Sequence, residues 1–198
     1  MPTTTKMGIV YPSSTDLVKD GATAMGTIST TVDNKTGMVL IKSATFSAVS
    51  AVSLDANTFS ATYDFYKLII SGNSSADVGF TGRFRAAGAD NSTANYNTTA
   101  VYTQNAVNPT RSSSAGVTAF EIGSVGTNGF SAEIRLYYPF STTYKKVFTA
   151  SSFGNFAADR TNLLIGGQFN ATTSFDSFSF YPNSGTFSGR YEIFGVNQ

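Results

Sequence analysis

Residues 130–137, Phe-Ser-Ala-Glu-Ile-Arg-Leu-Tyr, alternate apolar and polar side chains without interruption. Successive side chains of a β-strand point to opposite faces of the sheet, so this alternation predicts a half-buried strand. Residues 78–85, Val-Gly-Phe-Thr-Gly-Arg-Phe-Arg, have the same pattern, with Arg83 and Arg85 opposite Phe80 and Phe84. Two such segments indicate sheets with one face in a core and one face in water.

The same alternation recurs along most of the chain at a spacing of about 8–14 residues. Further strands are expected at 38–42, 46–54, 63–70, 144–153, 162–169, 175–181 and 186–196. The last two are predicted to form a closing hairpin, because Pro182 and Gly185 suit a four-residue turn. We interpret Gly123, Gly126 and Gly129 as turn glycines, and expect loops over 86–116 around a strand at 95–102. The pattern predicts an all-β fold, an antiparallel β-sandwich or jelly roll.

The composition restricts the functions that the chain can have. Ser and Thr supply 52 of its 198 residues, and only 13% of residues are charged, against roughly 25% in an ordinary domain. Without His and Cys, the chain has neither a Ser-His-Asp nor a Cys-His nucleophile, and it lacks the usual ligands for zinc, copper, haem or iron–sulfur clusters. A net charge of +1 provides no field for nucleic acid or anionic lipid. No apolar run is long enough for membrane insertion, and no secretory signal is expected.

The first 37 residues differ from the rest because they contain the one predicted helix, over 17–33. Thr15 or Asp16 is expected to cap it and Gly37 to end it. Its apolar stripe is formed by Val18, Met25, Ile28 and Val32. Two interpretations remain open: the helix lies on its own β domain, or it joins a small parallel bundle, formed by copies of the chain or by docking into a larger assembly. We expect an attachment and oligomerisation segment at 1–37 and a β-sandwich domain at 38–198.

Catalysis by carboxylates is the one enzymatic hypothesis that the composition leaves, since glycoside hydrolysis needs only two of them. However, Glu133 shares a strand face with Arg135, and Glu192 shares one with Arg190, so cross-strand ion pairs on a solvent-exposed face explain these positions without catalysis. No motif marks an acid and its partner, so we expect no enzyme, no catalytic residue and no cofactor. Asp90-Asn-Ser lacks the dense spacing of a calcium loop, and no metal site is expected.

A candidate binding surface lies in the polar stretch. Tyr96, Asn97, Tyr102 and Arg111, with Gln104 nearby, combine aromatic rings with amide and guanidinium donors, as sugar-binding surfaces do. The alternative is that both tyrosines pack at the domain edge or between subunits.

Two stretches resemble proteins of tailed bacteriophages. A segment near the start of many tail proteins resembles residues 11–25 of this chain, Tyr-Pro-Ser-Ser-Thr-Asp-Leu-Val-Lys-Asp-Gly-Ala-Thr-Ala-Met. The resemblance continues at residues 30–33, Thr-Thr-Val-Asp. The chain departs from the family at residues 26–29, Gly-Thr-Ile-Ser, where the family usually has Leu-Ala, and this departure weakens the helix. Residues 175–195 are similar to the closing hairpin of β-sandwich domains in tail-fibre and related virion proteins.

The resemblance implies a non-enzymatic virion structural protein, a tail fibre or tail-tip adhesin module made in the host cytoplasm. The implied partners are other copies of the chain in a homotrimer, other virion proteins at the N-terminal segment, and a glycan or protein of the host surface. A head-bound decoration or fibre protein without a receptor role is the first alternative. A capsule-polysaccharide depolymerase and an adaptor ring are the others.

Overall fold

The structure is a computed structural model that describes residues 21, 23, 25–28, 37–104, 109–156 and 159–196. From residue 38 onward these residues form a succession of strands. The strands are β1 (Met38–Val49), β2 (Val52–Ser53), β3 (Phe65–Ser74), β4 (Val78–Ala86), β5 (Ala89–Asp90), β6 (Tyr96–Gln104), β7 (Thr110–Val117), β8 (Phe120–Val125), β9 (Phe130–Tyr137), β10 (Lys146–Phe156), β11 (Asp159–Phe169), β12 (Ser177–Pro182) and β13 (Phe187–Val196).

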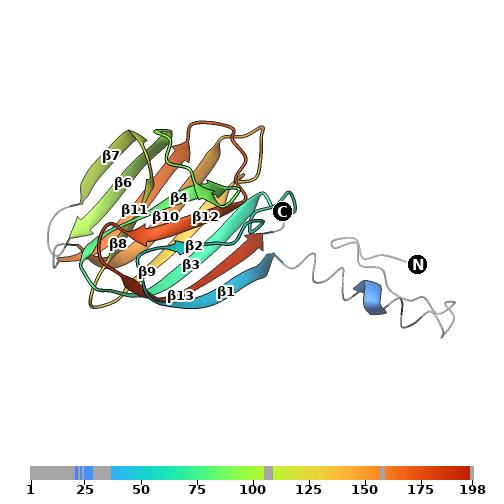
Figure 1. Cartoon of the computed structure of the whole chain (residues 1–198), viewed down its shortest axis with the longest axis horizontal. Coiled ribbons are helices and arrows are strands. Elements are labelled where there is room, and N and C mark those ends of the chain that lie inside the picture. The colour runs from blue at the N-terminus through green and yellow to red at the C-terminus, as the bar shows by residue number, and fades with distance from the viewer. Residues whose placement is uncertain are drawn as a thin grey trace.

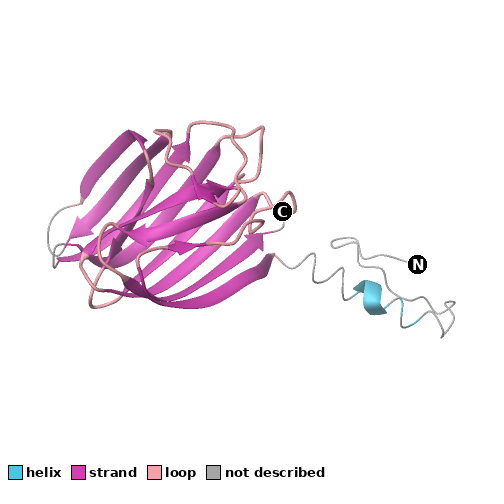
Figure 2. Ribbon diagram, viewed as in Figure 1, coloured by secondary structure: helices cyan, strands magenta, loops and turns pink. Residues whose placement is uncertain are grey.

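The strands form two antiparallel sheets that face each other (Figures 1 and 2). The large sheet has eight strands in the order β1-β13-β3-β9-β10-β11-β6-β7. The small sheet has the order β2-β12-β4-β5, and β8 also pairs with β4. The predicted fold class, an all-β antiparallel sandwich, is confirmed.

Aromatic side chains join the two sheets. Phe120, on β8 of the small sheet, stacks on Phe148 of the large sheet with ring centroids 4.1 Å apart. Phe178, on β12, lies 5.2 Å from the same Phe120 ring. The predicted alternation holds at this core, since Phe80 and Phe84 are fully buried, as are the apolar residues at alternate positions of β9. Burial of these large rings is the main contribution to the stability of the sandwich.

The predicted closing hairpin is wrong. β12 pairs with β2 and β4 in the small sheet, whereas β13 pairs with β1 and β3 in the large sheet. The backbone N–H of Asn183 still bonds to the carbonyl of Gly79 at 2.9 Å, while Ser75 N–H already bonds to the carbonyl of Thr186 at 2.8 Å. The turn therefore crosses from one sheet to the other. The sequence did not distinguish the two cases because Pro and Gly favour a tight turn in both.

The polar stretch and the glycines differ from the expectation in two ways. A strand over 95–102 is confirmed as β6, but 110–117 forms a further strand, β7, where loops were expected. Gly123 lies inside β8 beside a register shift opposite Phe80, with φ of 150°, and is not a turn residue. Gly126 and Gly129 do flank a turn, closed by the Gly129 N–H bond to the Gly126 carbonyl at 3.2 Å.

Residues 21, 23 and 25–28, the described part of the predicted N-terminal helix, are helical. The Thr27 hydroxyl donates to the carbonyl of Thr23, four residues earlier, at 2.9 Å. The other residues of that prediction lie outside the described part of the chain.

Candidate functional site

The sandwich is open at the β7 edge of the large sheet. β8, at the edge of the small sheet, packs over β10, β11 and β6. β7 is one strand further out and forms the edge of its sheet on the side away from β1 (Figure 1). Ser112 and Ser114, opposite Ala100 and Thr98 in the β6–β7 register, point towards the interior side but are exposed. No second sheet covers Ser112 and Ser114. Their hydroxyl groups therefore occupy positions that hold apolar side chains in a covered strand.

A groove follows this open edge between β6–β7 and β8. It contains two adjoining cavities of about 300 Å³ and about 200 Å³, which share Gly79, Ser114 and Glu121. We call the two together the β7 groove. Its other lining residues are Tyr102, Gln104, Ser112, Gly123, Ser124, Thr161 and Leu163 in the larger cavity, and Phe80, Thr81, Thr98, Val117, Ala119 and Asn183 in the smaller one.

Glu121 supplies the one carboxyl group among these lining residues. Its side chain is half-buried and has no hydrogen bond or ion pair within the described part of the chain. Burial raises the pKa of this carboxyl above its ordinary value of 4.5. Together with the hydroxyl and amide groups of the lining, this carboxyl group can form hydrogen bonds to a polar ligand.

Two buried hydroxyl groups at the groove also lack partners. Thr98, which lines the smaller cavity, is 6% exposed, and its Oγ1 has no hydrogen-bond partner. Ser152 is 3% exposed with an unpartnered Oγ, and it lies directly behind Gly123, where a Cβ would come within 1.8 Å of that oxygen. Buried polar groups in proteins almost always have a partner, so two unpartnered hydroxyls close to one groove are unusual, and Thr98 is the one that belongs to a residue of the groove lining.

The structure separates the four residues of the predicted sugar-binding surface. Tyr102 lines the β7 groove. Asn97 and Arg111 lie on the outer face of the large sheet, where the Asn97 side-chain oxygen accepts a bond from Gly116 N–H at 3.0 Å. Two adjoining shallow depressions on that outer face include Arg111 in one and Asn97 in the other, and neither includes Tyr96 or Tyr102.

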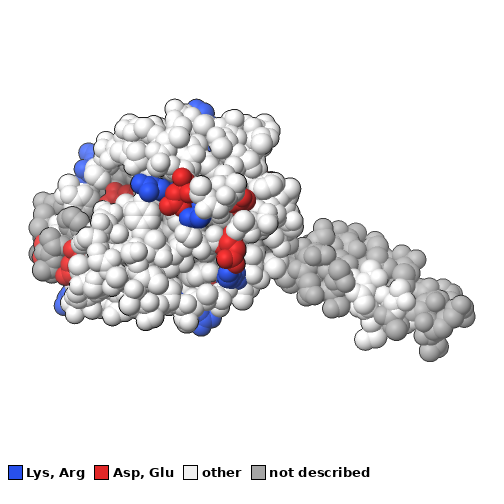
Figure 3. Space-filling view, in the orientation of Figure 1, with Lys and Arg blue, Asp and Glu red and all other residues white. Residues whose placement is uncertain are grey.

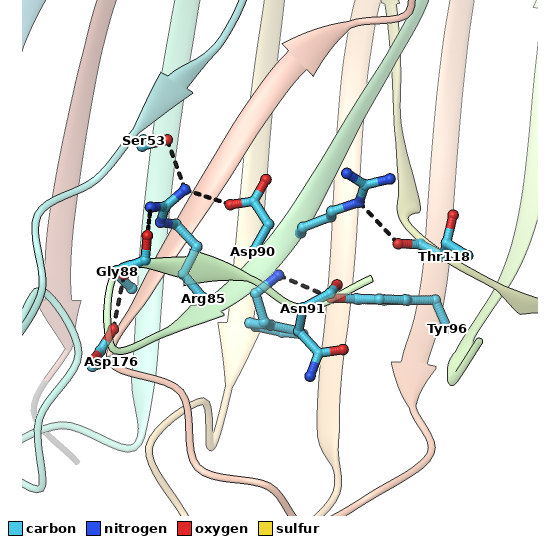
Figure 4. A network of polar contacts seen from close by, with 11 residues as sticks. Ser53, Arg85, Gly88, Asp90, Asn91, Tyr96, Thr118 and Asp176 are labelled. Atoms are coloured by element: carbon cyan, nitrogen blue, oxygen red, sulfur yellow. Dashed lines mark hydrogen bonds and ion pairs between the residues drawn. The ribbon is translucent and has the colours of Figure 1, made fainter. Parts of the chain in front are cut away.

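Tyr96, the fourth residue, belongs to the core. Its ring is fully buried and lies 4.9 Å from the ring of Phe169. Its hydroxyl accepts from Phe84 N–H at 3.1 Å and donates to the carbonyl of Asn91 at 2.9 Å, as Figure 4 shows in part. Burial raises the pKa of this hydroxyl strongly. The ring is therefore not available for stacking on a sugar.

Sequence reasoning missed Glu121 and Thr98 as candidate site residues. Glu121 is one of twelve acidic residues in the sequence and Thr98 one of 52 hydroxyl residues, and no motif distinguishes either of them. A usable signal was present in β7, whose Ser-Ser-Ser run at 112–114 contains no apolar residue on either face. A strand of that composition indicates a sheet edge that nothing covers.

A second polar cluster, around Arg85, is structural. The Arg85 guanidinium donates to Ser53 Oγ at 2.8 Å, to the Asp90 carboxylate and to the carbonyl of Gly88 (Figure 4). Asp176 accepts a bond from the backbone N–H of Ala87 at 3.0 Å. These bonds tie the β4–β5 turn to β2 and to the chain before β12, so the cluster stabilises loops.

Lys146 is likewise satisfied by its surroundings. Its Nζ donates to the carbonyl of Tyr144 at 2.8 Å and to that of Ser141. Burial lowers the pKa of this amine to about 8. The two carbonyl bonds close the loop before β10, which accounts for a buried lysine without a carboxylate partner.

Ion pairs do form on the outer face of the large sheet, but of the three pairs there only that of Glu133 on β9 with Lys67 on β3 is cross-strand as predicted, and the other two each lie within one strand. Glu133 bonds to Lys67 at 2.8 Å and to Arg135 at 2.9 Å, and Arg190 bonds to Glu192 at 2.5 Å. Within the described ranges, no cluster of three or more acidic side chains is placed to hold a metal ion. Of the residues described, no helix combines the length and apolar character needed to cross a bilayer.

The predicted oligomerisation stripe is described only in part. Met25 is 69% exposed and Ile28 is half-buried, while Val18 and Val32 lie outside the described residues.

Comparison with known proteins gives no family for the chain: no family model, no curated protein and no solved structure matches it.

Proposed function

We propose that this protein is a non-enzymatic structural module of a tailed-bacteriophage virion, a tail-fibre or tail-tip component that displays its β-sandwich for recognition of the host surface. Its N-terminal segment would attach to other virion proteins and associate with copies of itself, as a homotrimer. The resemblance of residues 11–33 and 175–195 to tail proteins supports this proposal.

The main support for the proposal is that the N-terminal segment and the β7 groove lie at opposite edges of the large sheet. The N-terminal segment enters the sandwich at β1, which is one edge of the eight-stranded sheet. The β7 groove lies at the opposite edge. A protein held through its N-terminal segment would therefore leave the groove free for a ligand.

The surface chemistry also supports display on a particle. Charged side chains are sparse on the face seen in Figure 3, and groups of opposite sign lie close together there. Between them lies a surface composed mainly of uncharged residues. Such a surface limits non-specific electrostatic binding and leaves recognition to hydrogen bonds and shape.

Binding of the fluorescently labelled full-length protein to intact candidate host cells tests the proposal. Within the part of the chain that the structure describes, the buried apolar core residues lie between Leu54 and Ile193, so a chain that begins at residue 38 retains them and serves as a comparison. Saturable binding by both forms would support recognition by the sandwich. Absence of binding on every host tested, with the full-length protein still oligomeric, would favour the decoration protein. Release of reducing ends from host polysaccharide would favour the depolymerase.

Assembly is tested separately with Met25→Asp. If the stripe at Val18, Met25, Ile28 and Val32 joins the copies, a buried carboxylate in it dissociates the oligomer. Size-exclusion chromatography with light scattering reports the mass. An unchanged oligomer would overturn the assigned role of the stripe, and Thr23→Asp, an exposed position in the same helical segment, is the matched control.

A further inference from the structure

We propose that the β7 groove binds a neutral pyranose, with Glu121, Thr98 and Ser114 as hydrogen-bonding residues and Tyr102 as the aromatic contact. This inference rests on the proposed role in surface recognition, and it names the site and the ligand class.

The unpartnered polar atoms indicate a ligand with several hydroxyl groups. A carboxylate only accepts hydrogen bonds, whereas the hydroxyls of Thr98 and Ser114 rotate and can donate or accept. A sugar hydroxyl also donates and accepts, so one ring can satisfy Glu121 and Thr98 together. Thr98 is the decisive residue because it lines the smaller cavity and its buried Oγ1 has no partner among the described residues.

Charge argues for a neutral ligand. No Lys or Arg is among the residues that line either cavity. A sugar acid would bring a second negative charge to Glu121 without a cation to compensate it. An ammonium group would pair with Glu121, but a half-exposed ion pair contributes little, and the buried hydroxyl of Thr98 would stay without a partner.

Size and shape agree with one sugar ring in a longer chain. The larger cavity, of about 300 Å³, lies at the lower end of the range of roughly 300–1,000 Å³ for small-molecule sites. Tyr102 is half-buried and packs against the core, so its ring is held at the groove wall. An aromatic ring in that position provides a flat apolar surface for the C–H face of a pyranose.

A tryptophan reporter makes the site measurable because the chain contains no Trp. Tyr102→Trp places the reporter in the groove, and Tyr137→Trp places a control on the outer face of the large sheet, where Tyr137 stacks on Phe65 at 4.8 Å. Methyl glycosides of glucose, galactose, mannose and N-acetylglucosamine are titrated to about 100 mM, well above a 1 mM dissociation constant. Glucuronate and glucosamine are the charged comparators.

We expect a saturable change of fluorescence from the reporter at position 102 with at least one neutral glycoside, and none from the reporter at 137. Adding Glu121→Gln should weaken this binding by about tenfold, since hydrogen bonds to a charged acceptor are lost. Ser114→Phe should abolish it by filling the groove. Ser113→Phe, the neighbouring position on the outer face, should leave it unchanged.

Amide resonances of β7 in the isotope-labelled wild-type protein provide a second measurement that needs no substitution. Absence of both responses would overturn the inference, as would binding that survives Ser114→Phe in a folded variant. A response to glucosamine alone would show a cation site and overturn the neutral ligand. Cell binding that Ser114→Phe leaves intact would refute the groove while the proposed function stands. Sugar binding in the groove without any binding to host cells would support the groove and refute the proposed function.

Discussion

The two edges of the large sheet have opposite chemistry although they belong to the same eight-stranded structure. At the β1 edge, Phe46 packs on Phe187 at 4.7 Å and reaches Phe180 of the small sheet at 6.2 Å. At the β7 edge, the inward positions are Ser112 and Ser114, and the chain from Thr110 to Gly116 is exposed throughout. Coverage by the second sheet makes the difference, because apolar side chains are stabilising only where water is excluded.

The charged groups near these edges differ in the same way. Lys42, on β1, forms an ion pair with Asp55, and that hydrogen bond raises the pKa of the lysine. Glu121, at the β7 groove, has no such partner, and burial raises its pKa. An unpaired half-buried carboxylate destabilises the fold, and sites shaped for binding commonly carry such a cost. The β1 side therefore contributes to stability, whereas the β7 side holds the proposed ligand-binding groove.

The largest effect on the free energy of unfolding is expected from a substitution in the aromatic core between the two sheets. Phe120→Ala removes the ring that contacts both Phe148 and Phe178, and should lower the free energy of unfolding by about 3–5 kcal/mol. Urea denaturation measures this loss. The exposed Val101→Ala, on the outer face, should change stability by less than about 1 kcal/mol. Equal losses at the two positions would contradict the arrangement of the core.

Gly123→Ala tests the close contact behind the groove. A Cβ there would lie 1.8 Å from Ser152 Oγ, and φ of 150° is unfavourable for any residue with a side chain. We expect a loss of about 1–3 kcal/mol in the free energy of unfolding. Gly88→Ala, also at positive φ but with no atom near the new Cβ, separates backbone strain from collision. A smaller loss at Gly123 than at Gly88 would argue against the collision.

Thr98→Val should stabilise the protein and weaken sugar binding at once. The substitution removes a buried hydroxyl that has no partner, which is expected to raise the free energy of unfolding by about 1 kcal/mol. Thr103→Val, on the exposed outer face of the same strand, is the control and should be near neutral. A destabilised Thr98→Val would mean that this hydroxyl already has a partner in the free protein.

The smallest effect concerns pH. Because burial raises the pKa of Glu121, the folded state holds this proton more tightly than the unfolded chain does. Its stabilising contribution is therefore complete below the unfolded value of 4.5 and is lost as pH rises through the raised pKa. Glu121→Gln should become progressively more stable than the wild type from acid to neutral pH, as measured by urea denaturation at each pH.

Lys42→Gln provides the contrast from the β1 edge. Lys42 stays charged across that range, and the stability linked to its raised pKa is lost only as pH rises through that pKa, above 10.5. Its stability difference from the wild type should therefore not follow the acid-to-neutral trend of Glu121→Gln. Parallel trends for the two variants would contradict the assignment of this pH dependence to Glu121.

Local pattern by itself determined the fold class, most strands and the orientation of their side chains. The alternation at 78–85 and 130–137 correctly placed Phe80, Phe84 and the buried side of β9, because side-chain period depends only on neighbouring residues. The placement of Glu133 and Glu192 on the outer face of the large sheet followed from the same local rule.

Only the tertiary structure decided which strands pair and where the sandwich stays open. Residues 177–182 and 187–196 looked like one hairpin but joined different sheets, since strand partners are chosen by contacts far apart in sequence. The same long-range packing buried Tyr96, left Tyr102 at a groove wall and brought Glu121 opposite Ser114. A tyrosine in a strand has the same local pattern in all these settings, and coverage by the second sheet determines whether it stabilises the core or faces a ligand.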